Sequence, residues 1–446
     1  MTYYPATDDE RKEMLDAIGA ESFDELIKNI PDDIRFKGNL DLPPRISECE
    51  TMRELYRIAE TNLHAGISNF LGGGSYDHVV PSAIGAITSR SEFYTAYTPY
   101  QAEVSQGTLQ SIYEFQSMIC QLTGMDISNA SMYDGGSALA EATLLAAAHT
   151  KRTGIVIAGA LNPDYRQIID TYCKSQDINV QEIPLKEGVT DLSALKKAVT
   201  DDTAAVIVQH PNFYGYLEDV TEIGEIAKSK KALYISVINP ISLGVLSPPG
   251  EYGADITIGE GQPLGVGLNY GGPYLGIFAV KKFLMRKIPG RLSGITVDRD
   301  GERGFVLTLQ TREQQIRREK ATSNICTNQG LMMLAATVYM ALLGKQGIQD
   351  VAKLCLQKSH YLAEKIREID GCSLKYDRPF FHEFIVTLPK PAKEVVRALT
   401  DKKILAGIPL SKWGGDPNDL MIAVTERRLN HELDSYVREL KAVLKE

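Results

Sequence analysis

Residues 204–238, AAVIVQHPNFYGYLEDVTEIGEIAKSKKALYISVI, contain two short apolar runs separated by an amphipathic stretch. The runs at 204–209 and 232–238 are rich in valine and isoleucine, which favour strands. Thr221–Lys230, between them, has the length and polarity pattern of a helix. Nearly continuous apolar strands joined through a helix are typical of a parallel sheet covered on both faces. We therefore predict a βαβ unit in this stretch.

The same alternation continues on both sides of this stretch. GIVIAG (154–159), INVQEIP (178–184) and ADITIG (254–259) are further short apolar runs, and Pro163–Ser175 and Asp191–Val199 are amphipathic and of helical length. The predicted fold class is therefore α/β, with a mostly parallel sheet. Ligands of such sheets bind in the loops at the carboxyl ends of the strands, so we look for function in those loops.

The chain divides into three predicted parts. Residues 1–60 form a helical arm with candidate N-caps at Thr7 and Ser22 and too few apolar residues for a core of its own. Residues 61–325 form the large α/β domain. Strands and helices interleave in residues 326–446, which predicts a smaller C-terminal α+β domain.

Composition excludes several classes of function. The net charge of −9 and the absence of long basic runs argue against nucleic acid as a partner. The six cysteines are scattered with no CxxC pair, which fits neither a zinc site nor a secreted disulfide framework. The polar, acidic start MTYYPATDDE predicts no secretory signal, and we find no run of about 18 apolar residues that could cross a membrane. We expect a cytoplasmic protein.

A glycine-rich turn before an alanine-rich helix is the first candidate site. In SMYDGGSALAEA (131–142), Gly135, Gly136 and Ser137 precede the helix, and free amides at a helix start attract anions. The alternative is a plain capped helix with Ser137 as its N-cap, and the local pattern alone favours that alternative.

The second candidate, EFYTAYTPYQ (92–101), repeats tyrosine at every third position: Tyr94, Tyr97 and Tyr100. Tyrosine combines an apolar ring with a hydroxyl that seeks a partner when buried, which suits a small polar ligand or a subunit interface. Taken alone, the pattern fits surface tyrosines packed on the next helix better.

Two further stretches carry weaker signals. In VQHPNFYGYLED (208–219), Asn212 follows a predicted strand on the expected ligand side, as a turn former or as a polar contact. His78 follows Asp77 directly, but adjacent side chains do not face each other in regular elements, so we interpret this pair as part of a loop. The histidines show no metal-ligand spacing, and we predict no metal site.

Several long strings, in order along nearly the whole chain, resemble the P-protein of the glycine cleavage system, glycine dehydrogenase (decarboxylating), in its N-terminal half. This half is a separate chain in many bacteria and archaea. The strings are EFYTAYTPYQAEVSQGTLQ, MYDGGSALAEA, VQHPNFYGYLED, PPGEYGADI, GQPLGVGLNYGGPYLGIFAV and RREKATSNICTNQ. The resemblance implies the aspartate-aminotransferase-like fold type I, which binds pyridoxal phosphate (PLP) between a large and a small domain, with the phosphate at the helix start near residues 134–137.

Two residues that this cofactor needs are missing. PLP enzymes hold the cofactor on a lysine and stabilise its ring nitrogen with an acid. Counting back from Pro273 puts Gln262 at the lysine position implied by the resemblance, and Asn239 follows the strand where the aspartate is expected. The resemblance therefore implies a chain that binds no PLP itself.

The implied function is that of a subunit. The partner, subunit 2 (the β subunit), carries PLP, and together the two chains decarboxylate glycine and transfer the aminomethyl group to the lipoyl group of H-protein. This chain contributes structure and part of the active-site wall, binding to glycine or lining the entry of the lipoyl arm. The predicted wall residues are Tyr94, Thr95, Tyr97, Tyr100, Gln101, Thr322, Ser323 and Asn324.

Two alternatives stay open. One is a self-sufficient PLP enzyme that uses Lys281 or Lys282, but these lysines lie past the next strand, roughly 20 Å further along extended chain. The other is a structural or regulatory partner of a PLP enzyme that does not contribute to its site. The tyrosine and Gly-Gly-Ser strings weigh weakly against that alternative.

Overall fold

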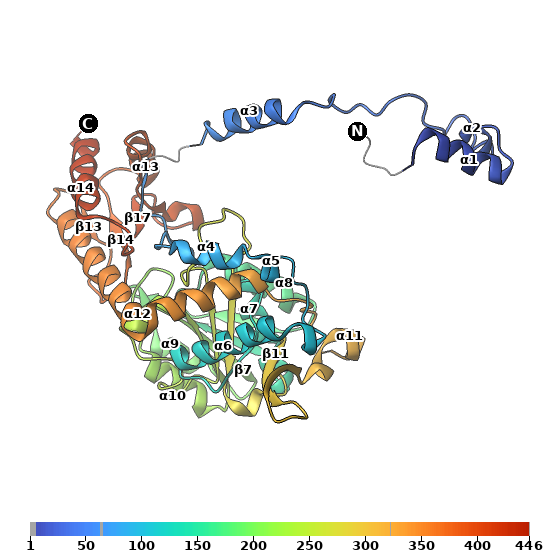
Figure 1. The fold of residues 1–446 in the computed structure, drawn as a ribbon. Helices are drawn as coiled ribbons and strands as arrows, with labels where there is room; N and C mark the ends of the chain where they lie inside the picture. The colour runs from blue at the N-terminus through green and yellow to red at the C-terminus, as the bar shows by residue number, and fades with distance from the viewer. Residues whose placement is uncertain (1–5, 63–65, 322, 446) are drawn as a thin grey trace. The chain divides into compact units, whose positions relative to one another are not determined.

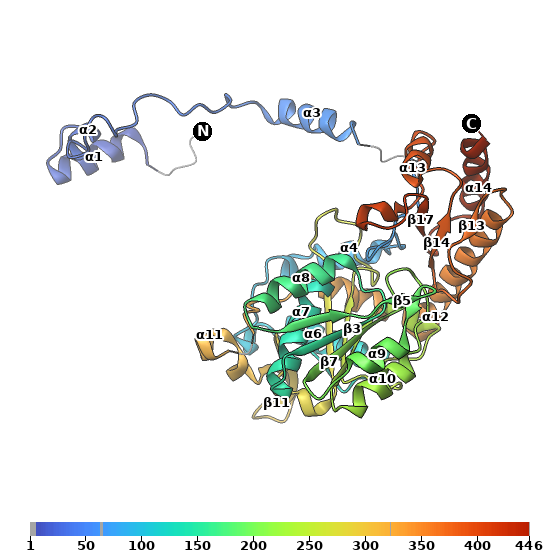
Figure 2. The same cartoon turned by 180° about the vertical axis from the view of Figure 1, so that it is seen from behind.

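A computed structural model describes residues 6–62, 66–321 and 323–445. The chain divides between residues 63 and 64 into two compact units (Figures 1 and 2). The predicted boundary between a large and a small domain at residue 325 falls inside the second unit and stays a prediction.

The first unit consists of the helices α1 (Asp8–Ile18), α2 (Phe23–Leu26) and α3 (Glu48–Ala59). The Thr7 hydroxyl accepts the backbone N–H of Glu10, which confirms the predicted cap of α1. Ser22 precedes α2, but its side chain makes no capping hydrogen bond. None of the three helices contains a buried residue, so this unit has no core of its own in these helices.

A seven-stranded sheet organises the second unit in the order β2-β10-β9-β8-β7-β3-β4. Its strands are β2 (Ile127–Ser128), β3 (Gly154–Ala158), β4 (Asn179–Glu182), β7 (Thr203–His210), β8 (Leu233–Ile238), β9 (Ile256–Glu260) and β10 (Gly276–Val280). The five strands from β4 to β9 pair in parallel, while β10 runs antiparallel to both of its neighbours. All five strands expected from the sequence are present, and the α/β class is confirmed.

Helices cover both faces of the sheet because neighbouring strand residues point to opposite sides. The covering helices are α7 (Gly135–Thr150), α8 (Pro163–Lys174), α9 (Leu192–Ala198) and α10 (Val220–Ser229). Ile155 of β3 lies in one apolar cluster with Leu139 of α7. The next residue, Val156, packs in another cluster with Ile223 of α10 (Figures 1 and 2). This alternation explains why the strands are apolar on both sides.

The helices α6 (Gln106–Thr123) and α12 (Gly330–Arg367) pack beside β10. Among the described residues, α12 alone is long and apolar enough to cross a membrane, which the sequence analysis did not expect. Its backbone leaves helical geometry at Gly344 (φ 59°, ψ −170°), and Tyr339 is buried in the core. We interpret α12 as a core helix in two segments.

A second, four-stranded sheet of order β13-β14-β17-β16 follows α12. Its strands are β13 (Ser373–Leu374), β14 (Glu383–Thr387), β16 (Ile408–Pro409) and β17 (Asp419–Ala423). The helices α13 (Ala392–Asp401) and α14 (Asn430–Lys445) share an apolar cluster with β14 and β17. The short strand β1 (Ser68–Asn69) pairs in parallel with β15 (Ile404–Leu405) beside this sheet, so the segment after residue 66 contacts the C-terminal part.

The remaining elements connect these layers. They are α4 (Ser82–Thr88), α5 (Ser91–Tyr94), α11 (Gln314–Arg317), the hairpin β5 (Leu185–Lys186) with β6 (Val189–Thr190), the hairpin β11 (Leu292–Val297) with β12 (Arg303–Thr308), and 3₁₀ turns at Ala102–Val104, Pro240–Gly244, Lys282–Leu284, Gln310–Arg312, Arg318–Lys320 and Leu410–Trp413. The segment before α4 runs past the carboxyl ends of the strands, where Tyr76 meets the loop that follows β9.

Candidate functional site

A small polar cavity lies at the carboxyl edge of the parallel sheet. Its volume is about 40 Å³. Gln209 at the end of β7, Asn239 after β8 and Glu260 at the end of β9 line it, which is where the fold class predicts a ligand. The other polar residues of the lining are Tyr76, Asn162, Tyr165, Asn212, His382 and Glu383.

The start of α7 contains the predicted anion cradle. Asp134 is the N-cap, and its carboxylate accepts the Ser137 backbone N–H at 2.7 Å. The expectation that Ser137 caps the helix is therefore wrong, because Ser137 is its third residue. A Cβ on Gly135 would lie 2.4 Å from the Tyr165 hydroxyl, so a glycine is required there. A Cβ on Gly136 would likewise meet the α8 side chains at 2.5 Å.

A carboxylate of the chain itself occupies this helix start. The backbone N–H of Gly135 donates to Oε2 of Glu260 at 3.0 Å. Oε1 of Glu260 accepts the backbone N–H groups of Gln262 and Leu275, both at 3.0 Å. Burial raises the pKa of Glu260 to about 7, although the three N–H groups favour the ionised form.

Gln262, at the expected lysine position, is 1% exposed and fully hydrogen-bonded. Its Oε1 accepts the Tyr76 backbone N–H at 2.8 Å. Its Nε2 donates to the carbonyl oxygens of Tyr76 at 3.0 Å and Val266 at 2.7 Å. The amide thus joins the loop after β9 to the segment before α4 and uses every hydrogen-bonding group it has.

Asn239, at the expected aspartate position, is also engaged inside the chain. Its Oδ1 accepts the Ile241 backbone N–H at 3.0 Å, and its Nδ2 lies 3.0 Å from Nε2 of His382. Burial, assisted by the charge of His78, lowers the pKa of His382 to about 3, so its ring is neutral at physiological pH. A neutral ring can accept the amide hydrogen of Asn239.

Glu383, at the start of β14, closes the cavity together with Tyr76. Its Oε1 accepts the Gly73 backbone N–H at 2.7 Å, and its Oε2 accepts the Tyr76 hydroxyl at 2.9 Å. Burial raises the pKa of Glu383 to about 7. The centroid of the Tyr76 ring lies 4.5 Å from that of the His382 ring.

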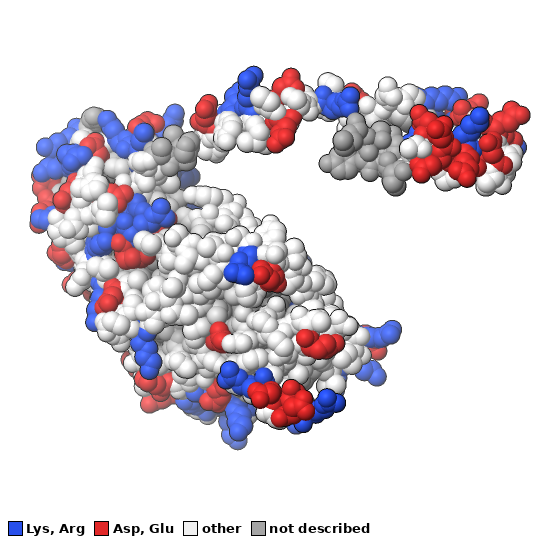
Figure 3. Space-filling model, viewed as in Figure 1, with Lys and Arg blue, Asp and Glu red and all other residues white. Residues whose placement is uncertain are grey.

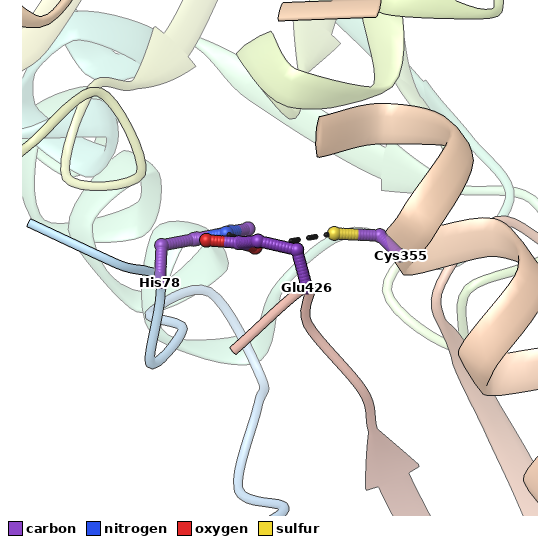
Figure 4. A group of neighbouring side chains, drawn as sticks. All are labelled: His78, Cys355 and Glu426. Atoms are coloured by element: carbon purple, nitrogen blue, oxygen red, sulfur yellow. Dashed lines mark hydrogen bonds and ion pairs between the residues drawn. The ribbon is translucent and has the colours of Figure 1, made fainter. Parts of the chain in front are cut away.

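His78, Cys355 and Glu426 form a neighbouring buried cluster (Figure 4). Nδ1 of His78 lies 2.6 Å from Oε2 of Glu426, to which the Cys355 thiol donates at 3.5 Å. Burial raises the pKa of Glu426, but its hydrogen bond with His78 and the charge of that ring outweigh burial and hold the pKa at about 2. These residue types can bind zinc, but their ligand atoms already bond to each other, so we interpret the cluster as an ion pair with a thiol donor.

The predicted tyrosine segment lies on the surface, outside the cavity. The side chains of Tyr94, Tyr97 and Tyr100 are 65%, 85% and 50% exposed. Gln101 is exposed as well, while the Thr95 hydroxyl donates to a backbone carbonyl of α5 at 2.7 Å. Their assignment to an active-site wall stays a prediction.

The other predicted wall segment borders a different cleft. Ser323 and Asn324 line it together with Glu141 of α7, and Thr322 lies outside the described residues. Burial raises the pKa of Glu141 to about 7, and a hydrogen bond from Ser323 opposes this shift.

Arg291 connects the two predicted wall regions at one point. It is 3% exposed, its guanidinium carbon lies 5.6 Å from the Tyr100 ring centroid, and Nη2 donates to the Cys326 carbonyl at 2.7 Å. Nη1 lies 3.3 Å from Oδ1 of Asn328. The structure therefore brings Tyr100 to the chain just after Asn324 rather than to the predicted residues themselves.

The profile of the glycine cleavage system P-protein family matches residues 1–440. The chain belongs to this family. The probable glycine dehydrogenase (decarboxylating) subunit 1 of Chloroherpeton thalassium is 57% identical over 99% of both chains. The protein of the same description from Anoxybacillus flavithermus is 50% identical over 98% of both chains.

Solved structures agree with membership of the P-protein family. A crystal structure of glycine decarboxylase (P-protein) of the glycine cleavage system, in inhibitor-bound form, superposes with a TM-score of 0.91 at 43% identity over 100% of both chains. The sphingosine-1-phosphate lyase Bpss2021 of Burkholderia pseudomallei K96243 gives a TM-score of 0.67 at 14% identity, covering 93% of this chain and 94% of the lyase. The latter likeness shows the fold alone.

The side chains at the two positions expected to hold PLP are already hydrogen-bonded within this P-protein family member. A glutamine amide cannot form the imine that holds the cofactor, and Gln262 is already saturated by hydrogen bonds. Asn239 cannot supply the charge that holds a proton on the ring nitrogen. The amide at the start of α7 binds Glu260.

Sequence reasoning missed the residues that complete the cavity. Glu260 stands two positions before Gln262 in GEGQ (259–262), so a local signal for it was present. Tyr76 is 186 residues from Gln262 and 307 from Glu383, and no local pattern connects residues at such separations.

Proposed function

We propose that this chain is the PLP-free subunit 1 of a two-chain glycine dehydrogenase (decarboxylating). In this proposal, subunit 2 carries PLP, and the complex decarboxylates glycine and transfers the aminomethyl group to the lipoyl group of H-protein. The observation that carries the proposal is Gln262, buried and hydrogen-bonded at the position where a P-protein that holds its own cofactor needs lysine. The names of the relatives support the subunit assignment.

An exposed, sparsely charged face supports a partner chain. Lysine, arginine, aspartate and glutamate are few on the face of the second unit that carries α4 and α5 (Figure 3). Tyr97 and Val104, on the same stretch of chain, are 85% and 76% exposed. Large side chains gathered on a sparsely charged surface are typical of an interface.

We assign this chain a share of the wall of its partner's site. The tyrosine hydroxyls can each donate one hydrogen bond to the carboxylate of glycine, and the rings can exclude water from it. Tyr97 is the first residue to test, because its exposed side chain can reach across an interface without changing the fold of this chain. Ser323 and Asn324 are secondary candidates for the path of the lipoyl arm.

The geometry disfavours the self-sufficient alternative. Val280 pairs with Ile256, the first residue of β9, whereas the cavity lies at the last residue of that strand. Lys281 therefore lies at the opposite edge of the sheet, where its Nζ donates to the carbonyl oxygens of Gly124 at 3.0 Å and Gly250 at 3.3 Å. It cannot reach the cavity from there.

We also propose a cytoplasmic location. All six cysteines are free, and Cys173 and Cys355 are buried, as in a chain that folds without disulfides. Unpaired cysteines are usual in reducing compartments.

The experiment that tests the function compares this chain, subunit 2 and their mixture. Each sample receives PLP and borohydride, and the fixed pyridoxyl group is located by peptide mass spectrometry. Glycine decarboxylation is measured with lipoylated H-protein on parallel samples that receive PLP but no borohydride. We expect label on subunit 2 alone and activity only in the mixture. Label on this chain, or full activity of subunit 2 without it, would overturn the proposal.

A further inference from the structure

The cavity at the sheet edge makes the proposed function more specific, and the inference drawn from it rests on that function. We infer that this chain's own side chains permanently fill the seat of the cofactor, so that a lysine at position 262 would not by itself restore PLP binding. The occupants are Glu260, Tyr76 and Gln262. Glu260 and Tyr76 line the cavity at the strand ends, and Gln262 holds the Tyr76 backbone in place.

Glu260 fills the phosphate end. Helix starts bind phosphate because their free N–H groups and dipole favour negative charge. Here the Gly135 N–H at the start of α7 is already bound to the Glu260 carboxylate at 3.0 Å. That carboxylate is held in place by two further backbone N–H groups, so it cannot swing away without leaving them unpaired. An arriving phosphate would meet both the bulk and the charge of this group.

Tyr76 fills the middle of the space between the sheet and β14. Its side chain is 8% exposed, its hydroxyl donates to Glu383, and its ring packs on His382. His382 in turn contacts Asn239 at the end of the sheet. These contacts tie the segment before α4 to the strand ends and to β14.

Gln262, at the expected lysine position, holds the backbone of Tyr76 in place. Its amide bonds both the N–H and the C=O of Tyr76, in the way that a neighbouring strand would. Replacing it with lysine removes these bonds but moves neither Glu260 nor the Tyr76 ring, both of which have other partners.

The remaining space agrees with this inference. The cavity of about 40 Å³ has room for a few water molecules. Sites for drug-sized ligands and cofactors measure about 300–1,000 Å³. An intact pocket that had lost only its lysine would keep a volume in the lower part of that range.

The test uses the full chain with and without subunit 2. The Gln262→Lys variant is incubated with PLP, reduced with borohydride and digested, and label at position 262 is quantified. The mean label per exposed lysine in the same digest gives the background for an unspecific amine, and Gln262→Met, which lacks an amine, confirms that label assigned to position 262 comes from the new lysine. We expect the Gln262→Lys variant to match that background. The same substitution combined with Glu260→Gly and Tyr76→Ala should give at least tenfold more label at position 262.

Stoichiometric label in the single Gln262→Lys variant would overturn the inference, and so would background label in a folded triple variant. If the triple variant does not fold, the unfolding midpoint of the unaltered chain in urea gives a second test. We expect millimolar PLP or inorganic phosphate to leave that midpoint unchanged, and a clear rise with either compound would show an open seat. Label on the unaltered chain would reject the proposed function, whereas label only after Gln262→Lys would reject this inference alone.

Discussion

The cavity at the sheet edge and the tyrosine segment 94–101 differ in where their polar groups find partners. At this edge, Glu260 in the cavity lining and Gln262 beside it are buried and bonded to the chain's own backbone. In the tyrosine segment, Tyr97 presents 85% of its side chain to the outside. A region whose polar groups are hydrogen-bonded within the chain contributes to folding. A region that leaves large polar rings exposed is available to a partner. We therefore expect the residues at the carboxyl edge of the sheet to stabilise the fold. The proposed contribution to catalysis belongs to the exposed tyrosine segment.

The largest expected effect comes from removing the carboxylate that holds the cavity together. Glu260→Ala leaves three buried N–H groups, those of Gly135, Gln262 and Leu275, without an acceptor. We expect the free energy of unfolding of the second unit to fall by about 3–5 kcal/mol, because each unpaired buried group costs about 1–3 kcal/mol. Urea denaturation followed by circular dichroism measures this. Glu260→Gln, which keeps one carbonyl acceptor, is the matched control and should lose clearly less.

The second prediction uses the pH dependence of the same cavity. The pKa values of Glu260 and Glu383 are raised to about 7 in the folded chain, above the ordinary carboxyl value of 4.5. The folded state therefore binds protons more tightly, so the stability from these groups is complete below pH 4.5 and is lost as the pH rises through 7. We expect the free energy of unfolding to fall by about 2.5 kcal/mol for each of these two groups between pH 5 and pH 8.

Urea titrations at several pH values follow this loss, and the double variant Glu260→Gln, Glu383→Gln should flatten the profile over the same interval. A profile that stays unchanged in the double variant would show that other groups set the pH dependence. The cavity would then not be the region that stabilises the folded chain in this pH range.

The third prediction concerns the exposed region. Tyr97→Phe should lower kcat/KM of the reconstituted complex for glycine about tenfold, which corresponds to one lost hydrogen bond of about 1.4 kcal/mol in the transition state. The stability of the isolated chain should change by less than about 0.5 kcal/mol, because the side chain is exposed. Tyr361→Phe, on α12, removes a hydroxyl bonded to Asp434 and serves as the control with unchanged kinetics. Unchanged kinetics for Tyr97→Phe would remove this residue from the proposed wall.

The smallest effect is expected at Lys281. Lys281→Met removes two hydrogen bonds to loop carbonyls at the far edge of the sheet. We expect a loss of about 1 kcal/mol in the free energy of unfolding and no change in the activity of the complex. Any loss of borohydride label on the complex after this substitution would indicate that Lys281 holds PLP, as the self-sufficient alternative requires.

The sequence by itself determined the parallel sheet and the positions of its strand ends. Short apolar runs such as 204–209 that alternate with helix-length stretches are typical of a parallel sheet covered on both faces, and that arrangement sends Asn239 and Glu260 to one edge. The motif strings also carried the family, because long strings in a fixed order are specific. The start of α7 was predicted in place, although its cap is Asp134 rather than Ser137.

Only the tertiary structure decided what fills the ligand edge. Gln262 revealed a missing lysine, but not that its amide is bonded to Tyr76, 186 residues earlier in the chain. Glu383, 307 residues from Tyr76, reaches the same cavity from β14. Local patterns report on neighbours in sequence, because backbone geometry sets those distances directly. Contacts across hundreds of residues arise from the packing of whole layers, so whether this edge is open or closed follows from how the segment before α4 settles between the two sheets.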